Sequence, residues 1–89
     1  MAQLGDSSAM PCFLIQHRHE ADECGAVFAS FKGYDSPLRR RATLCSCAFG
    51  GHAIWWRVEA DSAGEALELL PSYVAARATA TRVGAVDIP

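Results

Sequence analysis

The stretch that decides the fold is residues 13–24, which read FLIQHRHEADEC. Side chains alternate between the two faces of a strand, so one face of this stretch carries Phe13, Ile15, His17 and His19. The acidic residues that follow suit the positive end of a helix dipole, and apolar residues then recur at helical spacing at Cys24, Val27, Phe28 and Phe31. The stretch therefore predicts a strand that runs directly into an amphipathic helix ending near Lys32 and Gly33.

A β-hairpin is predicted next, because two strand-like runs, 43–49 and 52–59, are separated by Gly50-Gly51. A two-residue turn would set Cys47 opposite Ile54 and Cys45 opposite Trp56. These four side chains would then share one face of the hairpin.

A second helix and a fourth strand complete the pattern. Ser62 followed by Glu65 matches a capping box, and Pro71 must kink the helix or start a further turn. The β-branched run 79–88 predicts the last strand.

The resulting order, βαββαβ, predicts an α+β fold of the ferredoxin-like type, a four-stranded antiparallel sheet in the order 4-1-3-2 with both helices on one face. We expect residues 1–10 to form a flexible N-terminal arm and residues 11–89 to form a single domain. The opposite sheet face would be bare. Since 51% of the residues are hydrophobic, we expect a second copy of the chain to cover that face in a homodimer.

The chain resembles the small stand-alone bacterial proteins of the dimeric α/β barrel superfamily, and most nearly their uncharacterised and nickel-binding members. The resemblance rests on the βαββαβ pattern, the Met10-Pro11 start, the His17-Arg18-His19 strand end and the closing stretch from Val83 to Pro89. It implies a ferredoxin-like domain that dimerises into a barrel. No catalytic residue is carried over from it, since such folds host unrelated functions.

Charge and composition limit the kinds of partner that the chain can have. A net charge of −2 gives no general attraction to nucleic acid or to an anionic membrane, and no apolar run approaches the about 20 residues of a membrane-spanning helix. Arg39-Arg40-Arg41 is a local exception, interpreted as a solvated loop or as an anion site that lacks interleaved aromatic residues. With no export signal at the start, the four cysteines suggest reduced thiols or ligands in a cytoplasmic protein.

The strongest chemical candidate is a metal site at the strand-to-helix junction. Imidazole and thiolate groups bind zinc, nickel or copper, and His17, His19 and Cys24 crowd together there, with Cys45 as a fourth ligand. The competing interpretation makes Cys24 a buried core thiol and the histidines ordinary polar residues.

A second metal candidate is formed by Cys45, Cys47 and His52 on the hairpin. We expect the first and third strands to run parallel, which would place His17 and His19 far from the Gly50-Gly51 turn. The sequence therefore predicts two separate candidate sites, with Cys47 and His52 excluded from the first.

Three functions remain open. The first is a binding or accessory protein that holds a soft transition metal. The second is a small dimeric-barrel enzyme acting on an aromatic or polyketide-like molecule, with His17 or His19 as acid or base and with Trp55, Trp56 and Arg57 binding the ligand. The third is a purely structural interaction module.

Overall fold

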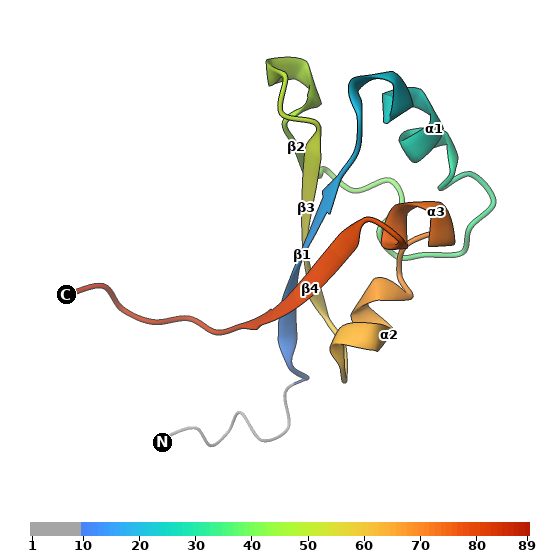
Figure 1. Cartoon of the computed structure of the whole chain (residues 1–89). Helices are drawn as coiled ribbons and strands as arrows, with labels where there is room; N and C mark the ends of the chain where they lie inside the picture. The colour runs from blue at the N-terminus through green and yellow to red at the C-terminus, as the bar shows by residue number, and fades with distance from the viewer. Residues whose placement is uncertain (1–9) are drawn as a thin grey trace.

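The structure, a computed structural model, describes residues 10–89 (Figure 1). The arm predicted for residues 1–10 lies outside the described residues except for Met10. Along the chain the elements are β1 (Cys12–Arg18), η2 (Ala21–Glu23), α1 (Cys24–Ala29), β2 (Leu44–Cys45), η3 (Cys47–Phe49), β3 (Ala53–Glu59), α2 (Ala63–Leu67), α3 (Ser72–Ala75) and β4 (Ala78–Val83). They confirm an α+β fold built on a four-stranded antiparallel sheet.

The sheet has the order β2-β3-β1-β4, and β1 pairs antiparallel with both β3 and β4. The prediction that the first and third strands run parallel was wrong. The connection through α1 makes β1 and β2 parallel, and β3, which returns from β2 and lies between them, is antiparallel to both. His17 therefore lies opposite Ile54, and the end of β1 lies beside the start of β3.

The hairpin between β2 and β3 is wider than the sequence predicts. Cys45 pairs with Ile54 instead of Trp56, and a six-residue loop, 47–52, replaces the two-residue turn. Ser46 closes this loop, because its backbone N–H donates to Ala53 O at 2.9 Å and its hydroxyl accepts from Ala53 N–H at 3.0 Å. Gly51 passes so close that a Cβ there would collide with Ser46 Oγ, so only glycine fits.

The helices are short, and their ends follow local rules. Glu20 N–H donates to the Glu23 carboxylate at 2.8 Å, which caps the turn that leads into α1. Ser62 accepts from Glu65 N–H at 3.1 Å at the start of α2, as the predicted cap requires. Pro71 ends this helical segment and starts α3. The last strand stops at Val83, whose partner Cys12 is the first residue of β1, so the predicted extension to residue 88 has no strand to pair with.

The helices cover one side of the sheet (Figure 1), and the core lies between the two layers. Its sheet side is formed by Phe13, Ile15, Ile54, Trp56 and Val58, and its helix side by Val27, Ala66, Leu70 and Val74. Two polar side chains are buried in the same layer, His17 at 1% exposure and His19 at 7%. Within residues 10–89 no helix has the length and hydrophobicity needed to cross a membrane.

Candidate metal centre

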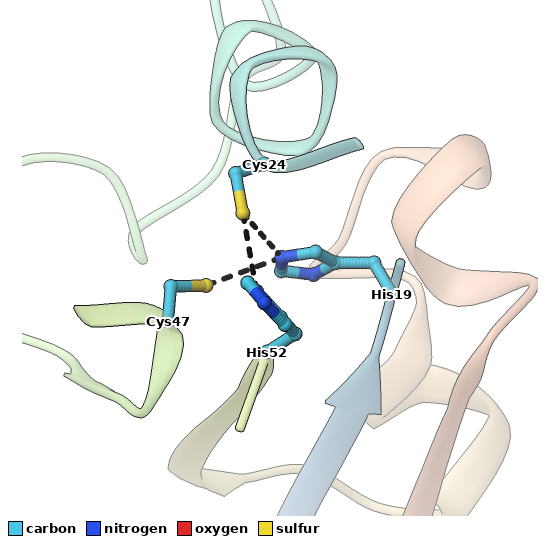
Figure 2. A group of neighbouring side chains, drawn as sticks. All are labelled: His19, Cys24, Cys47 and His52. Carbon is cyan, nitrogen blue, oxygen red and sulfur yellow. Dashed lines mark hydrogen bonds between the residues drawn. The ribbon is translucent and has the colours of Figure 1, made fainter. Parts of the chain in front are cut away.

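Four side chains converge at one end of the sheet: His19, Cys24, Cys47 and His52 (Figure 2). Each offers one nitrogen or sulfur atom, and these four atoms lie within 4.8 Å of one another. His19 Nε2 is 3.3 Å from Cys24 Sγ and 3.2 Å from Cys47 Sγ. Cys24 Sγ is in turn 3.4 Å from His52 Nδ1.

The sheet places the two histidines. His19 follows β1 and His52 precedes β3, and His19 N–H donates to His52 O at 3.0 Å, which holds the two backbones together. His52 takes the left-handed conformation with φ of 52°, which is uncommon for a residue other than glycine. That backbone directs its ring into the cluster (Figure 2).

The two thiols come from the short helices above the sheet end. Cys24 is the first residue of α1 and Cys47 the first residue of η3. The turn before Cys24 is fastened by Glu23, whose carboxylate accepts hydrogen bonds from Arg77 and from the Tyr73 hydroxyl, the latter at 3.0 Å. The Glu20 backbone N–H, followed by Arg77 and Tyr73, holds the pKa of Glu23 below its usual value. This ionised carboxylate ties the helix start to α3 and to Arg77, which lies in the turn between α3 and β4.

The nitrogen-to-sulfur separations in the cluster are close to those around a tetrahedral ion. Zinc bonds of about 2.3 Å to sulfur and about 2.0 Å to nitrogen put neighbouring ligand atoms about 3.3–3.8 Å apart at tetrahedral angles. For one nitrogen and one sulfur ligand the expected separation is about 3.5 Å. The three observed nitrogen-to-sulfur separations, from 3.2 to 3.4 Å, are slightly shorter than this. The donor set of two imidazoles and two thiols is that of a structural zinc site.

A chain of hydrogen bonds determines which ring nitrogen of His19 faces the cluster. Val74 O can only accept, so His17 Nδ1 carries the proton of the 2.9 Å bond between them. The neutral His17 ring therefore has a bare Nε2, which accepts from His19 Nδ1–H at 3.1 Å. His19 Nε2 is then also bare. Its lone pair is therefore free to bind a metal ion beside the two sulfurs, which lie 3.2 and 3.3 Å from Nε2.

The electrostatic setting keeps these imidazoles neutral. Burial lowers the pKa of His17, although its hydrogen bond to Val74 acts in the opposite direction. Burial also lowers the pKa of His19, and the neighbouring His52 adds to the effect. A neutral imidazole is the form that binds metals.

The Cys47 thiol differs from an activated nucleophile. Burial, followed by the neighbouring thiols of Cys45 and Cys24, raises its pKa to about 12. A catalytic cysteine has a lowered pKa, and nothing in this setting lowers it. A bound cation would replace the thiol proton and neutralise the repulsion between the sulfurs.

The cluster is open to solvent on one side. A hollow of about 480 Å³ is lined by Arg18, Glu20, Gly51 and Arg77 together with the two histidines His19 and His52. It gives an ion a path to the nitrogen ligands.

The predicted metal ligands are distributed around this cluster. His19 and Cys24 belong to it, whereas His17 lies behind His19 and holds it through a hydrogen bond. Cys45 is outside the group of four, and its sulfur accepts the Cys47 backbone N–H at 3.4 Å.

Cys47 and His52, which the sequence assigned to a separate site, complete the group because β1 and β3 are antiparallel. The sequence held a signal for them. Four residues separate His19 from Cys24, and four separate Cys47 from His52.

The residues predicted to bind an organic ligand lie elsewhere. Trp55 and Arg57 are on the face away from the helices, and Trp56 is on the helix side, packed against Phe31. All three line a hollow of about 200 Å³ at the β2 edge, smaller than most ligand pockets. No histidine is among its lining residues within the described part of the chain. Catalysis by His17 or His19 on a ligand there stays a prediction.

Compared with protein-family models, with curated proteins and with solved structures, the chain has no significant match. The geometry of the side chains therefore carries the functional argument.

Proposed function

We propose that this protein is a small metal-binding domain that holds one zinc-like divalent ion through His19, Cys24, Cys47 and His52. The observation that carries the proposal is the convergence of four soft or borderline donor atoms within 4.8 Å at the end of the sheet. Exposed acidic residues gather by chance on many surfaces. Two cysteines and two histidines from four different places in the fold have no such explanation.

The donor set favours zinc over its competitors. Magnesium and calcium prefer oxygen ligands, and none of the four donors is a carboxylate. Copper(I) and nickel(II) accept thiolate and imidazole too, but nickel(II) with such donors favours a square-planar arrangement. Four protein ligands fill a tetrahedral shell, which is the mark of a structural site rather than a catalytic one.

A structural ion suits the weakly packed region in which the cluster lies. Val27 is the only residue of α1 that is buried, and Phe28 on the same helix is 48% exposed. A small domain buries a limited share of its surface, and many small domains add a metal. Here the ion would join α1 and the hairpin loop to the sheet.

The proposal includes a ferredoxin-like arrangement that dimerises through the uncovered sheet face. The β2-β3-β1-β4 order supports the arrangement. Leu44, at 74% exposure, and Leu14 and Trp55 give that face apolar surface for a second copy. A reducing compartment such as the cytoplasm would keep the two thiols available to the ion.

Metal analysis of protein purified without a histidine tag tests the function. We expect one zinc per chain, and on substitution with cobalt we expect the visible absorption of a tetrahedral thiolate complex. Cys12→Ser is the matched control, because Cys12 lies at the other end of β1. Cys12→Ser should still bind one zinc per chain, whereas Cys47→Ser should bind none. An unmodified protein that binds cobalt only in octahedral form, or not at all, would contradict the proposal.

A further inference from the structure

A second candidate site lies near the C-terminal end of α1, where a hollow of about 450 Å³ opens between the helix, the loop 38–43 and β3. Three aromatic residues line it, Phe28, Phe31 and Trp56. Four cationic residues, Lys32, Arg39, Arg40 and Arg41, line it as well. The aromatic residues that the arginine triplet lacks in the sequence are therefore supplied by the fold.

The apolar wall of this hollow is preformed. Trp56 is only 8% exposed and packs against Phe31 with ring centroids 6.1 Å apart. Leu38, which is buried, and the half-exposed Phe28 complete the wall. A flat apolar group placed there would contact Phe31 and Trp56, which already pack against each other, so it would lose little free energy in ordering these two.

The charged part is concentrated and uncompensated. Four of the eight Lys and Arg residues of the chain line the hollow, although the net charge of the chain is −2. No Asp or Glu lines it. Across residues 10–89 the one ion pair found joins Arg77 to Glu23, which lie elsewhere. The local potential at the hollow is therefore positive.

We propose that this hollow binds a small organic anion with a flat apolar body, such as an aromatic carboxylate. The ring would lie against Phe31 and Trp56, and the carboxylate would meet the arginine side chains, whose planar groups bind carboxylates in pairs of hydrogen bonds. A volume of about 450 Å³ lies within the usual range for such ligands. The site does not depend on the metal proposal.

A nucleic-acid strand fits this surface less well than a single small molecule. Strands bind along grooves with several exposed aromatic rings on which successive bases stack. Here Trp56 is buried and Phe31 is partly buried, and both lie in one recess.

Titration of the protein with naphthoate tests the site. In a Trp55→Phe background Trp56 is the remaining tryptophan, and we expect its fluorescence to change in a saturable way. Naphthylmethanol, which has the same ring without the charge, and inorganic phosphate, which has a charge without the ring, should each bind at least about tenfold more weakly. Equal binding of naphthoate and the neutral alcohol, or no saturable change with naphthoate, overturns the proposal.

Charge removal tests the cationic part on its own. Replacing Arg39, Arg40 and Arg41 by glutamine should weaken naphthoate binding roughly tenfold, because three exposed ion pairs with the carboxylate would each be worth little but would act together. Arg82→Gln is the control, since Arg82 is exposed on β4 and outside the hollow. Equal weakening in the two variants overturns the proposal. If the triple variant does not fold, the loss of naphthoate affinity of the unmodified protein at high salt decides, and an affinity independent of salt contradicts the role of the arginines.

Discussion

The two halves of β1 are built on different physics, although their helix-facing side chains form one continuous row. In the first half Phe13 and Ile15 pack against Trp56, Val58 and the residues of α2 and α3. In the second half lies His17, and His19 follows directly after the strand; both are as buried as Phe13 and Ile15, but hydrogen bonds and the thiol cluster surround them. One half is held together by apolar area, and the other by directional contacts.

The difference shows how a small domain can be held together where it has no further apolar residues to bury. Apolar packing is non-directional and tolerates exchange between side chains of similar volume. The polar half depends on one tautomer, one lone pair and two sulfurs. We expect the polar half to contribute little to the stability of the fold without a cation. With the proposed cation it would become a cross-link between the helix layer and the sheet.

Removal of the metal should have the largest effect, and it should fall on the polar half. Free metal at ten thousand times its Kd stabilises a folded protein by about 5.5 kcal/mol. We expect a chelator to lower the free energy of unfolding by at least this order, and amide exchange to rise first in α1 and η3. Thermal unfolding with and without chelator measures it. In the Cys24→Ser variant the chelator should have no further effect, and a chelator effect that persists there would show that the ion is held elsewhere.

A core truncation in the apolar half should cost nearly as much but leave the metal in place. Ile15 is fully buried, so Ile15→Ala should lower the free energy of unfolding by about 2–5 kcal/mol. The loss should be the same in the metal-free and metal-loaded protein, because the two halves act independently. Denaturant unfolding of both forms provides the measurement, with Leu44→Ala as the exposed control. A loss of unfolding free energy found only in the metal-loaded form would contradict the independence of the two halves.

Replacement of His17 should show how far the polar half extends behind the ligands. Loss of an outer partner that orients a ligand costs about 10–100-fold in metal affinity. His17→Phe keeps a ring but cannot accept from His19 Nδ1–H, so it should show this loss. His17→Gln can accept that bond and donate to Val74 O, and it should recover part of the affinity. Competition with a metal indicator measures both variants, and equal affinities would reduce His17 to a packing residue.

The smallest effect concerns the backbone of His52. A non-glycine residue with φ of 52° carries a strain of about 1 kcal/mol, and glycine relieves it. His52→Gly should therefore slightly stabilise the metal-free protein while weakening metal binding, and His52→Ala should weaken binding without the gain. Metal-free melting temperatures and metal titrations separate the two effects. A gain with alanine as large as with glycine would contradict the strain argument.

The sequence predicted the local features of this fold well. Alternation along β1 placed Phe13, Ile15, His17 and His19 on one face, and Ser62 and Pro71 marked their helix starts. These features depend on neighbours in the chain, where spacing is informative.

The long-range features were harder to predict. The site needed the antiparallel pairing of β1 with β3, which brings residues 19 and 52 together. The hairpin register depended on the Ser46 hydroxyl and a helical loop, which two adjacent glycines do not reveal. Cys47 and His52 were thus recognised as possible metal ligands but assigned to a site separate from His19 and Cys24.

The backbone hydrogen bond between His19 and His52 has a consequence for the rate at which the proposed ion would exchange. It joins the two distant segments before any ion arrives, so the entropy of closing the long loop is already lost when the sheet forms. What remains to be ordered is local, namely the turn that carries Cys24 and the turn that carries Cys47. Release of the proposed ion would then require the opening of these two short turns and would leave the sheet intact. A cell could load and strip this protein many times without unfolding it.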